Sequence, residues 1–310
     1  MAFSYPHLPS IPPLDRDEER RVFRAMLDGT RPERVFALKA ASLWGKSYLV
    51  DLLEHDCWNR DLLCARLDFR DSKWDYLDLA ERLRDQWLRS ARRISPDLAE
   101  TVRAAFAPFT DMVERTRPGQ PPPPPVNIVV GSGRIDASRR DRHDVHIDAS
   151  GDAVYQPPPP GPAAYDQAQA RERQRLLTGA FLDCLETLTA HRQAICLLDT
   201  FEQADQADRE EDKAGQWFHR HVLTTARERG LRNLIVFLAG QDVPDLSGWR
   251  NWAYYQDRLD PFTEDACYQV AVCLGLSLPR HKVAAHYRRL RDMPPGQVAM
   301  FYSIYAEEVL

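Results

Sequence analysis

The stretch that most constrains the fold of this 310-residue chain lies near its N-terminus. Residues 35–38 are an apolar run, a short loop follows, and the loop ends in Gly45-Lys46-Ser47 before a second apolar segment. This order predicts a buried strand, a turn and a helix. In such an arrangement backbone N–H groups and a helix N-terminus can surround a triphosphate. We therefore expect Lys46 on the β- and γ-phosphates and Ser47 as a ligand of Mg²⁺.

The loop departs from the usual phosphate-binding pattern at its first position. The pattern begins with a glycine, which allows positive φ or close backbone approach, and this chain has Ala40 there. Because the tripeptide Gly-Lys-Ser is frequent by chance, an ordinary strand–turn–helix with a solvated Lys46 is the alternative. Trp44 could contact a nucleotide, although packing against the N-terminal helix explains it as well. The candidate nucleotide contacts here are Ala40, Leu43, Trp44, Gly45, Lys46, Ser47 and Tyr48.

A second apolar run, about 150 residues further along, ends in acidic side chains. Residues 194–202 read Ala-Ile-Cys-Leu-Leu-Asp-Thr-Phe-Glu, which is typical of a strand buried in a parallel sheet. Ligands of open α/β sheets bind at the carboxyl ends of the strands. Asp199 is therefore expected beside the loop as a ligand of Mg²⁺, and Glu202 is expected to polarise an attacking water. The alternative for Asp199 is a turn or helix N-cap residue.

Together these segments resemble the P-loop ATPase module of the STAND class, a branch of the AAA-like P-loop NTPases. Residues 40–47 resemble the Walker A loop and residues 195–202 the Walker B strand. Besides Ala40, two substitutions depart from the family: Asp15 replaces a glycine, and Gln241 stands where relatives carry an arginine. The order of the Gly-x-Pro turn also differs in residues 293–296. The remaining matching segments are residues 14–19, 22–27, 63–68, 234–240 and 259–266.

The resemblance implies a three-layer α/β fold whose parallel sheet has the strand order 5-1-4-3-2. It implies an ATPase core in residues 1–260 and a small helical lid in residues 261–310. ATP and Mg²⁺ are the implied cofactors, with Lys46 and Glu202 in catalysis. The implied metal ligands are Ser47 and Asp199, and the implied nucleotide contacts add Asp199 and Gln241 to the loop residues.

Periodicity and turn residues predict where the helices and strands lie. Strands that alternate with helices favour a parallel sheet. The expected helices are residues 15–28, 45–54, 74–92, 96–115, 166–190 and 212–229, with helical runs in 263–308. The expected strands are residues 35–39, 62–69, 194–199, 234–239 and 254–259.

A proline-rich segment interrupts the core. Residues 118–162 hold 11 of the 23 prolines, and such runs favour an extended polyproline II backbone over helix or central strand. We interpret residues 116–163 as an insertion between two helices. It is either a disordered linker or a β-hairpin on two stiff stalks that offers an edge for self-association or partner binding.

Composition narrows the class of protein. The net charge of −5 gives no general nucleic-acid footprint, so nucleic-acid binding is not expected. No run approaches the roughly 20 apolar residues of a membrane span, and the N-terminus lacks the pattern of a signal peptide. None of the six cysteines forms a Cys-x-x-Cys pair, which favours reduced thiols and a cytoplasmic protein.

Three functions are compatible with these features. The first is an ATP-binding STAND-like switch subunit with slow hydrolysis, which acts with a separate effector or sensor protein or as a homo-oligomer. The resemblance alone adds a bacterial conflict or defence system. The second is a catalytically inactive adaptor that binds partners through residues 116–163. The third, a small-molecule phosphotransferase, is weaker because no acceptor site is visible.

Overall fold

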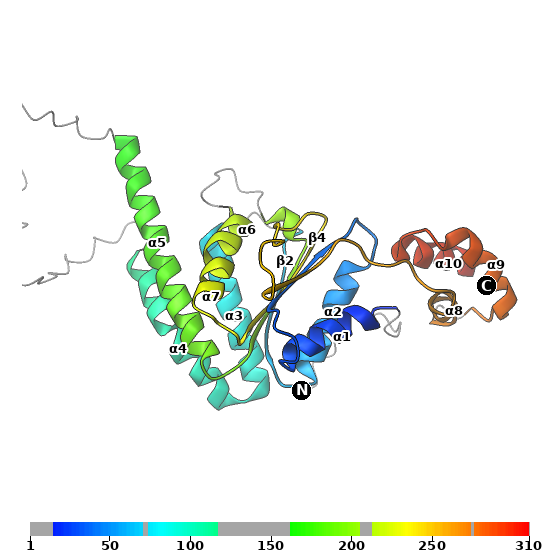
Figure 1. The fold of residues 1–310 in the computed structure, drawn as a ribbon, viewed down its shortest axis with the longest axis horizontal. Helices are drawn as coiled ribbons and strands as arrows, with labels where there is room; N and C mark the ends of the chain where they lie inside the picture. The colour runs from blue at the N-terminus through cyan, green and yellow to red at the C-terminus, as the bar shows by residue number, and fades with distance from the viewer. Residues whose placement is uncertain (1–14, 71–73, 117–161, 205–212, 274–275, 310) are drawn as a thin grey trace, which may run out of the picture.

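The chain folds into a parallel α/β core with a helical unit at its C-terminal end (Figure 1). The computed structural model describes residues 15–70, 74–116, 162–204, 213–273 and 276–309. Every pair of neighbouring strands is parallel, and the order is β2-β3-β4-β1-β5, which reads 5-1-4-3-2 from the opposite edge. The strands are β1 (Val35–Lys39), β2 (Leu63–Asp68), β3 (Ala194–Asp199), β4 (Leu234–Gly240) and β5 (Ala253–Gln256).

Helices cover both faces of the sheet (Figure 1). One face packs against α1 (Asp17–Leu27) and α2 (Lys46–Trp58). The other face packs against a larger set, with α4 and α5 as an antiparallel pair on the outside. That set is α3 (Tyr76–Ile94), α4 (Pro96–Arg115), α5 (Pro162–Thr189), α6 (Ala214–Trp217), the π-helical η3 (Phe218–Leu223) and α7 (Thr224–Glu228).

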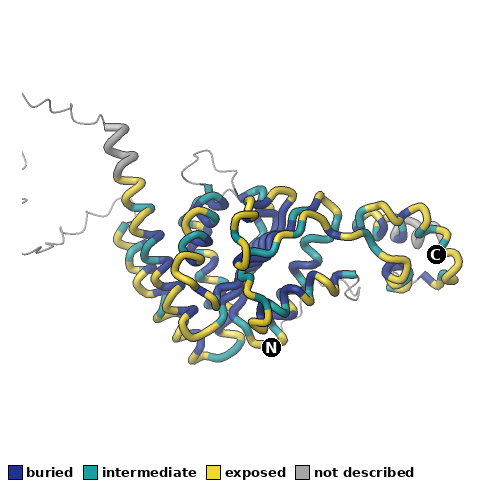
Figure 2. Tube along the Cα trace, in the orientation of Figure 1, coloured by how far each residue is buried: buried dark blue, intermediate teal, exposed yellow. Residues whose placement is uncertain are grey.

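The alternation of side chains along β1 explains the two cores. Val35 and Ala37 belong to the cluster under α3, α4 and α5, whereas Phe36 and Leu38 belong to the cluster under α1 and α2. A strand buried on both faces has no polar side to show, which is why it reads as an uninterrupted apolar run. Figure 2 shows the sheet as the most continuously buried part of the chain.

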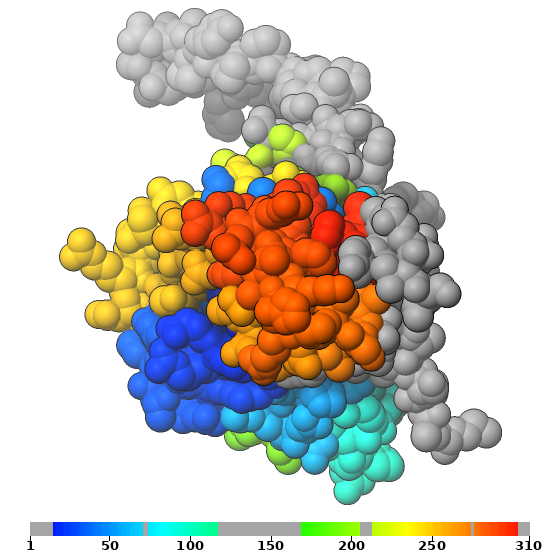
Figure 3. Space-filling model, turned by 90° about the vertical axis from the view of Figure 1, so that its right-hand side faces the viewer, coloured from blue at the N-terminus to red at the C-terminus, as the bar shows by residue number. Residues whose placement is uncertain are grey.

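Residues after the sheet form a separate small helical unit, called the lid below. It consists of α8 (Glu264–Cys273), α9 (Arg280–Leu290) and α10 (Pro295–Val309). The lid has its own core, which includes Val270 and Tyr302. Figure 3 shows the lid in orange to red over one end of the molecule, beside α1 in dark blue.

Several predicted boundaries were wrong for identifiable reasons. Helix α2 continues beyond residue 54 because Asp56 in its last turns accepts hydrogen bonds from Arg20 and Arg24 of α1. Strand β5 is shorter than residues 254–259 because Gln256 turns its amide to the Arg258 carbonyl, where the chain leaves the sheet.

The predicted helix over residues 212–229 is a succession of α6, η3 and α7, and an i→i+5 segment leaves no mark in a periodicity pattern. Its end was predicted correctly, since Gly230 follows with φ +69°. The insertion at residues 116–163 lies almost entirely outside the described residues, as does the proposed hairpin. No helix in the described parts of the chain is long and apolar enough to span a bilayer.

Candidate functional site

The loop between β1 and α2 brings a helix N-terminus to the carboxyl end of the central strand. Gly45 occupies the N-cap of α2 with φ +85°, a conformation that glycine adopts without strain. Leu43 also has a positive φ, +69°, which is uncommon for a residue with a side chain. The first backbone N–H groups of the 13-residue helix α2 have no intrahelical acceptors, so this end of the helix favours an anion.

Lys46 begins α2 and turns back over the loop. Its Nζ donates to the carbonyl oxygens of Ala40, at 2.6 Å, and Ala41, at 2.9 Å. Burial lowers the pKa of Lys46, while the negative charges of Glu202 and Asp199 act in the opposite direction. Lys46 is thus a half-buried cation held over the loop by backbone carbonyls.

Asp199, the last residue of β3, is fully buried. Its Oδ1 accepts the Thr200 N–H at 2.9 Å, whereas its Oδ2 has no hydrogen-bond partner among the described residues. Burial is the main cause that raises the pKa of Asp199, and the nearby Ser47 hydroxyl opposes that rise. A buried carboxylate oxygen without a partner is costly unless a cation or donor reaches it.

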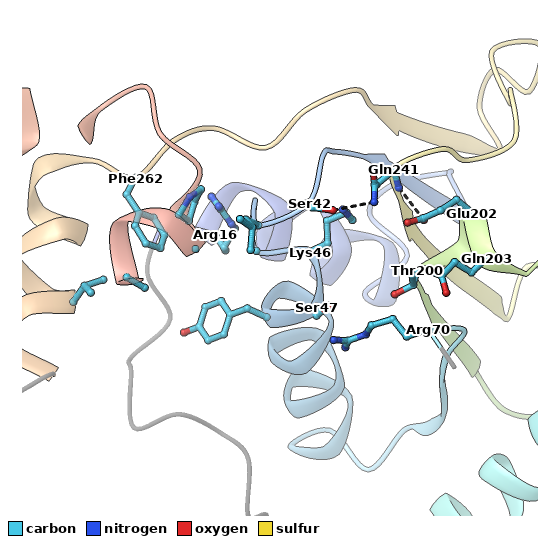
Figure 4. Close-up of a pocket in the computed structure, with 17 residues that line it drawn as sticks. Arg16, Ser42, Lys46, Ser47, Arg70, Thr200, Glu202, Gln203, Gln241 and Phe262 are labelled. Atoms are coloured by element: carbon cyan, nitrogen blue, oxygen red, sulfur yellow. Dashed lines mark hydrogen bonds between the residues drawn. The ribbon is translucent and has the colours of Figure 1, made fainter. Parts of the chain in front are cut away.

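Glu202 follows through a strained turn. Thr200 has φ +58°, a left-handed conformation that is unfavourable for a β-branched residue, and its Oγ1 donates to Asp68 at 3.1 Å. The turn leads into the single-turn helix η1 (Phe201–Gln203), which carries Glu202. Glu202 Oε2 accepts the Gln241 N–H at 2.9 Å, and the Gln241 side chain donates to Ser42 Oγ at 2.9 Å (Figure 4). Gln241 therefore connects the carboxylate to the loop.

Gly240 makes this approach of Glu202 to β4 feasible. A Cβ at position 240 would lie 2.5 Å from the Asp242 carbonyl oxygen and 2.7 Å from Glu202 Oε2. Both distances are shorter than real carbon contacts, so any side chain here would push Glu202 away. A glycine at the end of β4 is thus required by the position of the Glu202 carboxylate.

These groups line a cavity of about 440 Å³ between the core and the lid, a size typical of small-molecule sites. One end is polar, and Figure 4 shows Lys46, Ser47 and Glu202 there. The other end is mostly apolar and is contributed largely by the lid. The polar lining includes Ser42, Lys46, Ser47, Arg70, Thr200, Glu202, Gln203 and Gln241, and the apolar lining includes Leu43, Phe262, Val270, Pro295 and Ala299.

Arg16 fastens the two sides of the cavity together. Only 1% of this residue is exposed, and its guanidinium donates to the carbonyl oxygens of Trp44 in the loop and Asp260 before the lid, at 3.1 and 3.2 Å. It also lies 5.7 Å from the centre of the Phe262 ring. Burial lowers the pKa of Arg16, which nearby acidic groups raise. The N-terminal segment thereby joins the loop to the first residues of the lid.

The lid also contacts the loop directly. The Gly296 N–H, at the start of α10, donates to the Leu43 carbonyl oxygen at 2.8 Å. A Cβ at position 296 would lie 3.0 Å from that oxygen, so glycine permits the close approach. The loop is therefore held by the lid at Leu43 and by Arg16 at Trp44.

Most of the predicted site residues meet in this cavity. Leu43, Gly45, Lys46, Ser47, Tyr48, Glu202 and Gln241 line it. Asp199 lies beneath Ser47, and Ala40 contributes a carbonyl oxygen to Lys46. Trp44 is not among the lining residues and packs against the core cluster under α1.

Arg16, Arg70 and the apolar lining residues other than Leu43 were not predicted as site residues. Arg16 and Phe262 lie in segments that resemble the family, and this resemblance was the one sequence feature that could have assigned them to the site. Arg70 gave none, because an arginine two residues after a strand-end aspartate reads as a surface ion pair.

Comparisons with known proteins do not add to this picture. No family model matches the chain, and a search of curated proteins finds no match. What the site does must therefore be inferred from its geometry.

Proposed function

We propose that this chain binds ATP with Mg²⁺ in the cavity between core and lid, and that it is a STAND-like P-loop switch subunit. The observation that carries the proposal is the fully buried carboxylate of Asp199 beside the Ser47 hydroxyl, and the Oδ2 of that carboxylate makes no hydrogen bond of normal geometry to the described residues. A carboxylate and a hydroxyl together form a donor set that suits Mg²⁺, which is usually bound by few protein ligands plus substrate phosphates. The residues present thus fit the cation.

The polar end of the cavity suits the triphosphate. Lys46 and the N-terminus of α2 offer a cation and backbone N–H groups to the phosphates. When bound, Mg²⁺ would neutralise charge on the phosphates, with Ser47 and Asp199 as its protein ligands. Glu202 is oriented by the Gln241 N–H and is placed to hold an attacking water.

The apolar end of the cavity suits the nucleotide base, and its position on the lid side allows nucleotide binding to change how the lid and the core are arranged. Phe262, Val270 and Pro295 come from the lid side, whereas the phosphate-binding groups come from the core. A ligand that fills both ends contacts both units, so it favours the closed arrangement over any in which the lid moves away. A separate effector or sensor protein, or a second copy of the chain, would then recognise the closed arrangement.

The wider context of the proposal rests on resemblance. A role in a bacterial conflict or defence system comes from the STAND likeness alone, whereas a cytoplasmic location is inferred from the cysteine pattern. The adaptor alternative relies on residues 116–163, which lie outside the described part of the chain except at its edges. The ATP site and the adaptor role differ in one measurable property, nucleotide affinity that depends on Lys46.

Calorimetric titration of the full chain with ATP and Mg²⁺ tests the proposal. Lys46→Ala removes a charged contact to phosphate and should weaken binding by about 1.5–3 kcal/mol, or about 10- to 150-fold. The matched control is Lys39→Ala, because Lys39 ends β1 but pairs with Asp242 outside the cavity lining. Equal affinities of the two variants would refute the phosphate-loop assignment, and no binding by the wild type at millimolar ATP would favour the adaptor.

Replacement of Glu202 separates binding from turnover. Glu202→Gln keeps an oxygen that can accept the Gln241 N–H, so ATP affinity should change less than threefold, a range of about 0.6 kcal/mol. Phosphate release should fall at least about 100-fold, since an amide cannot take a proton from water. Turnover at the wild-type rate would show that Glu202 does not orient the water.

A further inference from the structure

Arg70 lies at the polar end of the cavity in a position fixed by Asp68. It follows β2, and its backbone N–H donates to Asp68 Oδ1 at 3.0 Å. Its Nε and Nη2 both donate to Asp68 Oδ2, at 3.0 and 2.7 Å. Asp68 in turn accepts the Thr200 hydroxyl, so the arginine is tied to the turn that carries Glu202. The guanidinium is thus oriented by the strand ends rather than free on the surface.

The side chain points into the site. Arg70 lines the cavity, and Figure 4 shows its guanidinium directed toward Ser47, at the end opposite Phe262. Its positive charge is felt at Asp199, where it lowers the pKa against the larger effect of burial. More than half of the Arg70 side chain, 57%, is exposed, so a ligand in the cavity can reach it.

The balance of charge at this end calls for a second cation. Glu202 lines this end of the cavity and Asp199 is buried beside Ser47, so two carboxylates flank the proposed phosphate site. Among the described residues the cavity is lined by three cations, and the Arg16 guanidinium is directed to backbone carbonyls. Without Arg70, Lys46 would be the one side chain of positive charge, among the described residues of the lining, left to offset a triphosphate flanked by two carboxylates.

We propose that Arg70 is a phosphate-binding residue supplied in cis, which contacts the terminal phosphate and distinguishes ATP from ADP. The inference rests on the proposed ATP site and deepens it. A guanidinium has five N–H donors in a planar fork, and phosphate oxygens compete well for such donors with the groups that already hold them. Because ADP lacks the terminal phosphate, contact with Arg70 favours the triphosphate state of the switch.

The test compares ATP and ADP affinities of full-length variants in the presence of Mg²⁺. Arg70→Gln should lower ATP affinity about tenfold or more and change ADP affinity less than about twofold, since only ATP loses a charged contact. The control is Arg103→Gln, which removes an exposed arginine of α4 paired with Glu100 and should change neither affinity. Thermal midpoints of all variants are measured alongside.

Two results would overturn the role of Arg70. One is unchanged ATP affinity in Arg70→Gln while Lys46→Ala loses it, which leaves the proposed function standing. The other is an equal loss of ATP and ADP affinity together with a lower thermal midpoint, which would show a structural role. Absence of ATP binding by the wild type would refute the proposed function itself and the role of Arg70 with it.

A second variant keeps the test decisive if Arg70→Gln does not fold. Arg70→Lys retains the charge for Asp68 but cannot offer two parallel N–H groups to a phosphate. It should lower ATP affinity about threefold or more with ADP affinity unchanged, and equal affinities of this variant and the wild type for ATP would refute the contact.

Discussion

At the scale of single residues, the buried carboxylate of Asp199 lowers the stability of the core. Its carboxylate is fully buried, and one oxygen lacks a partner within the described residues. Burial raises its pKa, so the folded state holds the proton more tightly than the unfolded chain does. The stability cost is therefore present above the raised pKa and disappears as the pH falls through it.

Asp199→Asn should stabilise the protein when Mg²⁺ and nucleotide are withheld. At pH 7.5 with a chelator, the free energy of unfolding should rise by about 1–3 kcal/mol, because the uncharged amide removes the desolvation cost of a buried negative charge. The gain should shrink as the pH falls through the raised pKa of Asp199, because the wild-type carboxyl then becomes neutral as well. Urea unfolding at several pH values measures it, with Asp111→Asn on the exposed side of α4 as control. A destabilised variant at pH 7.5 would contradict this account.

The same residues show what sequence can and cannot reveal. Asp199 and Glu202 were predictable because a buried parallel strand is recognisable in the sequence as an apolar run. The acidic residues that follow such a strand lie at the carboxyl edge of the sheet, where ligands of open α/β sheets bind. Arg16 was not assigned, because its partners are the backbone carbonyls of Trp44 and Asp260. Backbone acceptors exist at every residue, so no side-chain pattern marks them.

At the scale of elements, Gly240 at the end of β4 leaves room for Glu202 because it has no side chain. Gly240→Ala would place a Cβ against Glu202 and the Asp242 carbonyl. We expect a loss of about 1–3 kcal/mol in stability from overpacking, and loss of turnover because Glu202 moves off the Gln241 N–H. Chemical unfolding and phosphate release measure the two effects.

The control for that change is another glycine. A Cβ at Gly248 has no atom within 4 Å, and its φ is not in the left-handed region, so Gly248→Ala should alter stability by less than about 1 kcal/mol. Similar effects at both positions would show that Gly240 is not a contact position.

Element boundaries were predicted best where local chemistry decides them. The bounds of β1 and α4 were predicted correctly, because an apolar run with a loop and a Ser-Pro start are strong local signals. The π-helical segment η3 and the early end of β5 were missed. The π-helix has an extra residue in its turn, and the Gln256 amide at the end of β5 donates both to the nearby Arg258 carbonyl and to Glu19 of α1, neither of which a periodicity pattern registers.

At the scale of the whole molecule, Arg16 joins the core, the loop and the lid. Arg16→Met keeps much of the apolar stem and removes the donors to Asp15, Trp44 and Asp260. The free energy of unfolding should fall by at least about 1.5 kcal/mol, since hydrogen bonds to a buried charged group are lost. Urea unfolding measures it, with Arg21→Met on the exposed face of α1 as the neutral control. Equal changes in the free energy of unfolding for the two variants would show that Arg16 does not hold the core, the loop and the lid together.

The contact between lid and loop allows the closed arrangement to be followed through the exchange of backbone amides. The Gly296 N–H bonded to Leu43, the loop amides of residues 40–49 and the turn at residues 199–203 all border one cavity. A nucleotide with Mg²⁺ that binds there should reduce local opening of these segments together.

Amide hydrogen exchange of the full chain, with and without ATP and Mg²⁺, tests whether a nucleotide binds between core and lid. We expect slower exchange in residues 40–49, 199–203 and 293–299 when the ligand is bound, and no such change in Lys46→Ala. Slower exchange confined to other segments, with these three unchanged, would contradict a nucleotide site between core and lid.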